Sequence, residues 1–134
     1  MSDWNAQVIE EFSGNDGRVG GFTGRPLLLL TTTGRRTGTR WVNPLMYISD
    51  GDRLVVFASK GGAPNYPDWF RNFMSDPEVT VEVGTGTYQA EASVVHGAER
   101  DRLWAEMTRR FPQFAEYETK TDRVIPVIAL VRTD

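Results

Sequence analysis

The sequence contains no cysteine, which excludes disulfide bonds, thiolate nucleophiles, iron–sulfur clusters held by cysteine and thiolate zinc sites. Histidine occurs once, as His96 beside Gly97 at the end of an expected strand, and we interpret it as a surface residue rather than part of a triad or a metal site. The carboxylates are scattered and lack the spacing of a calcium-binding loop. The sequence therefore predicts no bound metal and offers few groups for acid–base catalysis.

Long hydrophobic runs are also missing. The longest ones, at 27–30 and 127–131, have the length of strands and fall far below the roughly 20 residues that span a bilayer as a helix. The first twelve residues contain acidic side chains and no apolar core, unlike a secretory signal. We therefore expect a cytoplasmic protein with no stable insertion into a membrane.

The length of 134 residues predicts a single domain, 1–134, because two separate cores would each be too small. Within it we expect a short helix in 1–14 and a barrel over 15–134. The formal net charge of -3 argues against general nucleic-acid binding, which depends on a basic face that neutralises phosphates.

Six segments have the composition and alternation of strands, and they are separated by turn signals such as Asp50-Gly51-Asp52. These strands are expected at 26–33, 40–48, 53–59, 78–84, 87–96 and 124–131. Helices are expected at 4–12, 68–75, 98–110 and 113–121, the second of them directly after Pro67. Pro126 suggests that the last strand lies at an edge or contains a bulge. Hairpin-connected strands with helices between them predict an antiparallel barrel of the α+β class.

The positive charges are concentrated in one segment. Residues 17–49 contain five arginines (Arg18, Arg25, Arg35, Arg36 and Arg40) and no acidic residue, so this segment carries +5 and the rest of the chain carries -8 of the total of -3. A basic segment on an otherwise acidic chain indicates a compact anionic ligand rather than a long polyanion.

Residues 31–40, TTTGRRTGTR, form the centre of the basic segment. Glycines let a turn present backbone N–H groups, threonine hydroxyls add donors, and arginines bind phosphate or carboxylate oxygens in a bidentate manner. The loop is a candidate phosphate-binding turn, although its glycine spacing fits neither a Walker loop nor a dinucleotide fingerprint. A solvated hairpin with basic side chains accounts for the same pattern.

A second loop, ASKGG at 58–62, also follows a strand and combines a hydroxyl, a cation and two glycines. In an antiparallel order the strands that end near Thr33 and Ser59 run in the same direction, so both loops should lie at the same end of the barrel. Lys60 could then join Arg35 and Arg36 around one anionic group.

Three blocks of the sequence carry a resemblance to a known family: LLLLTTTGRRTGTRWVNPLMY at 27–47, FASKGGAPNYPDWFRN at 57–72 and FPQFAEYETKTDRVIPV at 111–127. Together, and in this order, they resemble the deazaflavin-dependent nitroreductase family of actinobacteria, over the chain from about residue 15 onward. The resemblance implies a split β-barrel, similar to FMN-binding split barrels. It also implies hydride transfer from reduced coenzyme F-420, an 8-hydroxy-5-deazaflavin with a phosphate and polyglutamate tail, to a small organic acceptor such as a quinone, a nitroaromatic or an unsaturated lactone.

The same resemblance implies a set of site residues. The cofactor-binding residues would be Arg35, Arg36, Thr37, Gly38, Asn43, Pro44, Phe57, Ala58, Ser59, Lys60, Gly61, Trp69 and Asn72. The acceptor would contact Met46, Phe111, Phe114 and Tyr117, and Tyr117 or a water molecule bound to Ser59 would deliver a proton after hydride transfer. For Trp69, packing on a helix face is the competing interpretation.

The chain departs from better-known relatives at several positions in or beside this set. Trp41 replaces a basic residue, Met46 replaces a tyrosine, and two aromatic positions of the acceptor pocket are Phe111 and Phe114 rather than tyrosine. These changes make the expected acceptor pocket more apolar, which favours quinone-like acceptors.

Two other functions and two further properties stay open at this stage. A related barrel could bind FMN, since cationic loops accept a single phosphate equally well, or the protein could carry the deazaflavin without catalysis. The apolar aromatic residues around the expected acceptor site favour an enzyme. The sequence leaves open a homodimer, and peripheral contact with a membrane if the acceptor is a quinone.

Overall fold

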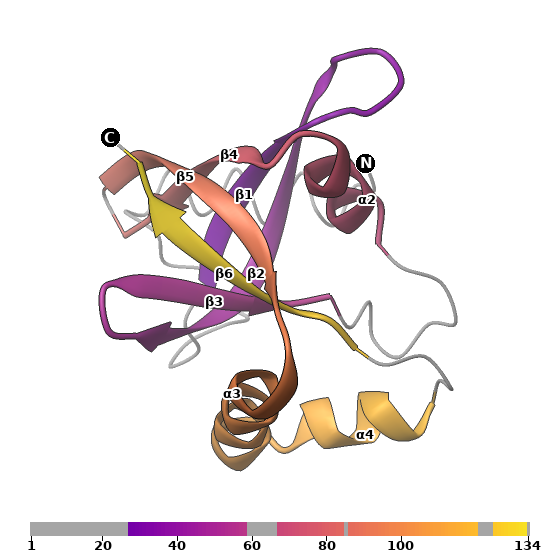
Figure 1. Ribbon diagram of the computed structural model, residues 1–134, viewed down its shortest axis with the longest axis vertical. Coiled ribbons are helices and arrows are strands. Elements are labelled where there is room, and N and C mark those ends of the chain that lie inside the picture. The colour runs from indigo at the N-terminus through magenta and orange to yellow at the C-terminus, as the bar shows by residue number, and fades with distance from the viewer. Residues whose placement is uncertain (1–26, 59–66, 85, 121–124, 134) are drawn as a thin grey trace.

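The structure is a computed structural model that describes residues 27–58, 67–84, 86–120 and 125–133. The helix expected within 1–14 lies outside the described residues. Six strands form a closed antiparallel barrel in the order β1-β2-β3-β6-β5-β4, in which β4 also pairs with β1. The strands are β1 (Leu27–Thr33), β2 (Arg40–Asp50), β3 (Arg53–Phe57), β4 (Glu78–Val83), β5 (Gly86–Val95) and β6 (Val127–Arg132). Figure 1 shows this barrel with helices at its periphery, which confirms the predicted α+β class and antiparallel barrel.

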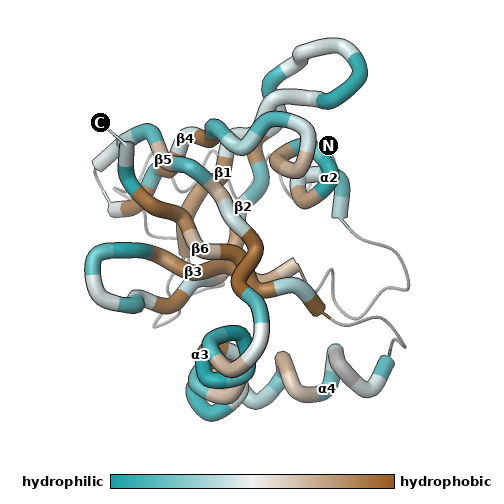
Figure 2. Tube along the Cα trace, viewed as in Figure 1, coloured by the Kyte–Doolittle hydropathy of each residue, from teal (hydrophilic) through white to brown (hydrophobic). Residues whose placement is uncertain are grey.

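The barrel interior is filled by alternate residues of the strands, because successive side chains of a strand point to opposite faces. Leu28 and Leu30 of β1 lie inside with Val56 of β3. We call the whole set the barrel cluster; it consists of Leu28, Leu30, Val56, Ala58, Trp69, Phe73, Val79, Val81, Ala90, Ala92, Ile128 and Leu130. Figure 2 shows the hydrophobic colours concentrated on the strands that cross at the centre of the barrel.

The outer face of the barrel is covered on one side by α3 (Gly97–Arg110) and α4 (Gln113–Thr119). The second set of alternate residues packs there and forms the helix-side cluster: Ile48, Val55, Phe57, Val95, Leu103, Trp104, Met107, Phe114, Ile125, Val127 and Ala129. Burial on both faces explains why the segment 127–130 is continuously apolar.

The prediction, based on Pro126, that the last strand lies at an edge of the sheet is wrong. The last strand begins after it, at Val127, and pairs with β3 on one side and β5 on the other, so it is an interior strand of the closed barrel. The proline precedes the strand, where its missing N–H costs no ladder bond. Its carbonyl oxygen accepts a hydrogen bond from the backbone N–H of Ala58 at 3.0 Å.

Helix α2 (Asp68–Ser75) lies at one end of the barrel, as Figure 1 shows. Its bounds agree with the prediction, since Pro67 precedes its first residue and Asp76-Pro77 follows its last. Trp69 and Phe73 occur at a spacing of four, so both side chains lie on one face of the helix and pack into the barrel cluster. This packing places the helix beside β1 and the hairpin loop that follows it. None of the helices in the described part of the chain is long and apolar enough to cross a membrane.

Candidate functional site

The loop that joins β1 to β2 (residues 34–39) is closed by its own backbone. The N–H of Gly34 donates to the carbonyl of Thr39 at 2.7 Å, and the N–H of Gly38 donates to the carbonyl of Gly34 at 2.9 Å. Gly38 has a φ of 75°, in the left-handed region that glycine adopts at little cost. The hydroxyls of Thr37 and Thr39 lie 2.8 Å apart and share a hydrogen bond. The basic loop is therefore an ordered turn.

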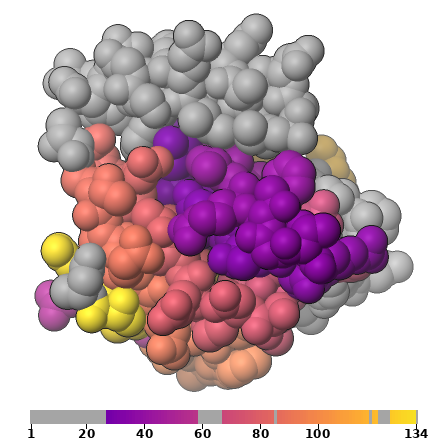
Figure 3. Space-filling model, turned by 90° about the horizontal axis from the view of Figure 1, so that it is seen from above, coloured from indigo at the N-terminus to yellow at the C-terminus, as the bar shows by residue number. Residues whose placement is uncertain are grey.

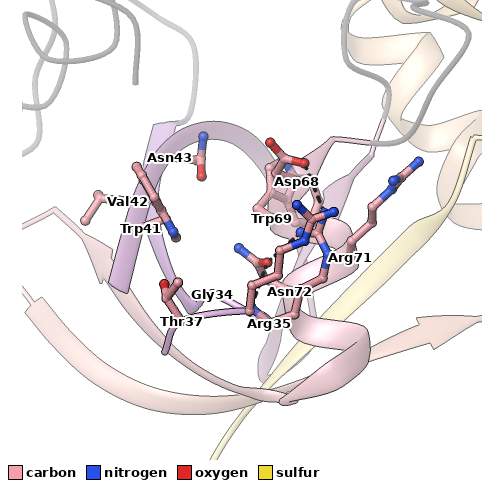
Figure 4. Close-up of a pocket in the computed structure, with 11 residues that line it drawn as sticks. Gly34, Arg35, Thr37, Trp41, Val42, Asn43, Asp68, Trp69, Arg71 and Asn72 are labelled. Atoms are coloured by element: carbon pink, nitrogen blue, oxygen red, sulfur yellow. Dashed lines mark hydrogen bonds and ion pairs between the residues drawn. The ribbon is translucent and has the colours of Figure 1, made fainter. Parts of the chain in front are cut away.

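Gly34 also allows a close approach of the Trp41 ring. A Cβ atom at position 34 would lie 2.9 Å from the carbonyl oxygen of Thr39 and 3.0 Å from the indole Nε1 of Trp41. Because the first of these contacts is with backbone, any larger residue would force the loop to shift. Figure 4 shows the indole directed toward this glycine.

Asn72 of α2 fixes the loop to the helix. Its Oδ1 accepts hydrogen bonds from the backbone N–H of Arg35 at 3.3 Å and from Nη1 of the same residue at 2.9 Å. Its Nδ2 donates to the hydroxyl of Thr32 at 3.3 Å. Both Asn72 and Thr32 are buried, with exposed fractions of 3% and 1%. A buried amide thus orients one edge of the Arg35 guanidinium.

A pocket of about 660 Å³ lies between this loop, the start of β2 and α2. It is lined by Gly34, Arg35, Arg36, Thr37, Trp41, Val42, Asn43, Asp68, Trp69, Arg71 and Asn72 (Figure 4). Trp41 and Asn43 pair with Thr32 and Leu30, so they belong to the inward face of the barrel at its end. Seen from above, the atoms of the β1–β2 hairpin, in indigo and violet, form one continuous area of the molecular surface (Figure 3).

The pocket is cationic. Arg36 and Arg71 are exposed, and their side chains make no hydrogen bond or ion pair with the residues that the structure describes. Arg35 is 3.6 Å from Asp68, measured between Nη2 and Oδ1, and this is the only ion pair among the described lining residues. Two arginines are therefore available to an anionic ligand, while Trp41, Val42 and Trp69 supply apolar wall.

Six of the residues expected to bind the cofactor line this pocket: Arg35, Arg36, Thr37, Asn43, Trp69 and Asn72. Gly38 lies in the same loop and Pro44 follows Asn43 in β2, but neither lines the pocket. Trp69 is also packed against Phe73, with ring centroids 6.3 Å apart, as helix-face packing requires. Asn72 reaches the pocket wall with its polar atoms already bonded to Arg35 and Thr32.

The other expected cofactor residues have different surroundings. Phe57 packs in the helix-side cluster, and Ala58 is buried in the barrel cluster with its N–H bonded to Pro126. Ser59, Lys60 and Gly61 lie outside the described residues. β1 and β3 both pair antiparallel with β2 and hence run in the same direction, as expected. Pairing of β2 with β3 begins only at Tyr47, so residues 40–46 of β2 have no partner in the described part of β3.

The residues expected to contact the acceptor do not line this pocket. Phe114 belongs to the helix-side cluster, and Met46, Phe111 and Tyr117 pack against it. The rings of Phe57 and Phe114 are 6.2 Å apart, and those of Phe114 and Tyr117 are 5.1 Å apart. Figure 1 places α4 and the β1–β2 hairpin at opposite ends of the molecule. Within the described residues, the aromatic side chains of Phe114 and Tyr117 on α4 are thus separate from the cationic pocket.

Five lining residues were not among the expected site residues: Gly34, Trp41, Val42, Asp68 and Arg71. Asp68, Arg71 and Asn72 are spaced by three and four residues along α2, so they share a helix face. That spacing was the available signal, but it indicates a site only once the helix is known to lie beside the basic loop.

Comparison with known proteins gives a consistent result. A family model described as F-420H(2)-dependent quinone reductase matches residues 4–132. An F-420H(2)-dependent quinone reductase of Mycobacterium tuberculosis is 35% identical over 126 residues, which cover 90% of this chain and 85% of that protein. A solved structure of a reductase dependent on reduced F-420 is 38% identical, with a TM-score of 0.73 over 79% of this chain and 94% of that one. A second solved structure, described only as a domain-swapped dimer, is 34% identical, with a TM-score of 0.75 over 96% of this chain and 97% of that one. With its barrel and nearly its whole length matched, this chain belongs to the F-420H(2)-dependent quinone reductase family.

Proposed function

We propose that this protein transfers a hydride from reduced coenzyme F-420 to a quinone, and that the pocket between the 34–39 loop and α2 holds the acidic tail of the coenzyme. Membership in the family supports the cofactor and the class of acceptor. The placement of the tail depends on one observation, the side chains of Arg36 and Arg71 that line the pocket without partners among the described residues.

The residues present fit such a group. Phosphate and carboxylate oxygens are bound well by arginine and by hydroxyls, and the loop contributes Arg36 and Thr37 to the pocket. The pocket volume of about 660 Å³ lies within the usual range for small-molecule sites.

The residues around the pocket would bind and orient the cofactor rather than react. Arg36 and Arg71 would neutralise the phosphate and glutamate groups, and the hydroxyl of Thr37 would donate a hydrogen bond to one of their oxygens. Asn72 would keep Arg35 oriented by holding one edge of its guanidinium. The chemistry that reduced F-420 supplies when bound is two-electron hydride transfer. Positioning by a rigid loop and helix is the contribution expected from the protein.

The activity is tested by mixing the protein with reduced F-420 and menadione and following the absorbance of oxidised F-420. We expect one oxidised F-420 for each menadione reduced, and no comparable turnover with reduced FMN. Binding of F-420 without reduction of menadione or of other quinones would contradict the proposal and indicate a carrier. Faster turnover with FMN would contradict the choice of cofactor.

Reduction of a quinone also requires a proton, and we propose Tyr117, or a water molecule held by Ser59, as its source. In the described part of the chain the Tyr117 hydroxyl makes no hydrogen bond, and its ring packs on Phe114. The Tyr117→Phe enzyme is expected to lose about a hundredfold or more in kcat with an unchanged melting temperature, since a positioned proton donor contributes at least about that much. Tyr88→Phe, which removes a hydroxyl on β5, serves as the control. Unchanged turnover in Tyr117→Phe would exclude the tyrosine from proton transfer.

The relative described as a domain-swapped dimer supports a homodimer for this chain as well. We also propose that the protein is cytoplasmic and contacts the membrane surface if its quinone acceptor is lipid-soluble.

A further inference from the structure

Asp68 is the only carboxylate among the described residues that line the cationic pocket. It occupies the first turn of α2, and its side chain is 87% exposed. Its Oδ1 lies 3.6 Å from Nη2 of Arg35. A negative charge in a pocket for an anionic ligand has the wrong sign for binding, so its presence calls for an explanation.

The two edges of the Arg35 guanidinium have different partners. Nη1 donates to the buried Oδ1 of Asn72 at 2.9 Å, and this contact belongs to a network that also includes Thr32. Nη2 faces the exposed Asp68 at a distance beyond that of a hydrogen bond. One edge is therefore fixed by the protein, whereas the other is paired with a side chain that can move into solvent at little cost, because exposed ion pairs contribute little to stability.

We propose that Asp68 is a displaceable counter-anion that lowers the affinity of the pocket for the anionic tail of the cofactor. It competes with the ligand for Nη2 of Arg35, and it repels the ligand's charges when displaced. Three arginines around a polyanion would otherwise release it slowly, since differences in affinity at one site are expressed chiefly in the dissociation rate. Asp68 would thus help oxidised cofactor to leave after each turnover. This inference rests on the proposed function and identifies the residue that sets affinity at the same site.

The test is the affinity of Asp68→Asn for oxidised F-420, measured by fluorescence titration at low ionic strength. Asp52→Asn is the matched control: this exposed residue lies in the turn between β2 and β3, at the other end of β2, and its removal changes the net charge from -3 to -2 equally. We expect Asp68→Asn to bind F-420 about threefold to tenfold more tightly than Asp52→Asn, the range for removing one partly screened charge. The dissociation rate of F-420 should be lower for Asp68→Asn than for Asp52→Asn. Loss of folding cannot imitate this result, because it would weaken binding.

Two further variants separate the possible failures. In an Arg35→Gln background, the change in log Kd for F-420 caused by Asp68→Asn should be less than half of the change that it causes in the wild type. A full gain in that background, or equal or weaker binding by Asp68→Asn relative to Asp52→Asn, would overturn the inference. If in addition Arg36→Glu binds F-420 as well as the wild type, the proposed tail site itself is wrong; if Arg36→Glu binds weakly, only the role of Asp68 is rejected.

Discussion

Replacing Arg36 by glutamate is expected to weaken the binding of F-420 by about a hundredfold and to leave the fold intact. The side chain of Arg36 is exposed and has no partner in the described part of the chain, so its loss should hardly change the free energy of unfolding. A hydrogen bond to a charged group contributes about 1.5–3 kcal/mol, and each 1.4 kcal/mol corresponds to a factor of ten in affinity. Repulsion between the new carboxylate and the acidic tail adds to this loss.

The affinity is measured by fluorescence titration with oxidised F-420, with Arg110→Glu as the control. Arg110 lies in the last turn of α3, away from the pocket, and both exchanges change the net charge from -3 to -5. We expect near wild-type binding in the control and a strongly reduced salt dependence in Arg36→Glu, since fewer charges then hold the ligand. Equal affinities in the two variants would show that the tail does not contact the loop.

The Asn72→Leu protein is expected to lose both stability and cofactor affinity. Leucine has a similar size but offers no partner to Arg35 and leaves the hydroxyl of Thr32 without its bond from Nδ2. A buried polar group without a partner costs about 1–3 kcal/mol. Without the amide, the guanidinium of Arg35 is no longer held at one edge, and we expect the affinity for F-420 to fall by about tenfold because the binding geometry must be ordered when the ligand arrives.

Asn43→Leu provides the comparison for this variant. Asn43 lines the same pocket, but its amide makes no hydrogen bond within the described residues, so the free energy of unfolding should change much less. Denaturant unfolding and F-420 titration of both proteins separate the two effects. If Asn72→Leu unfolded and bound F-420 like the wild type, the network between the loop and α2 would have no role in the site.

Much of the fold was predictable because its signals are local. The apolar, β-branched composition of 53–57 and 127–132, the tight turn at Gly51 and the position of Pro67 directly before α2 each depend on a few neighbouring residues. The closure of the barrel was not local. It requires β6 to pair with β3, about seventy residues earlier in the chain, and the edge suggested by Pro126 failed for that reason.

The candidate site divides in the same way. The basic loop was identified from its own arginines, glycines and threonines, and the structure places Gly34, Arg35, Arg36 and Thr37 in the pocket wall. Arg71 and Asp68 were missed, because they reach the loop only through the packing of Trp69 and Phe73 into the barrel. The role of Asn72 as a support for Arg35 likewise depends on tertiary contact, whereas the resemblance suggested only that it contacts the cofactor.

The central claim is that the acidic tail of F-420 lies between the 34–39 loop and α2. A crystal structure of the protein with oxidised F-420 tests it most directly. The account predicts tail phosphate or carboxylate oxygens within hydrogen-bonding distance of the guanidinium groups of Arg36 and Arg71. A tail bound elsewhere, with both arginines still facing solvent, would contradict it.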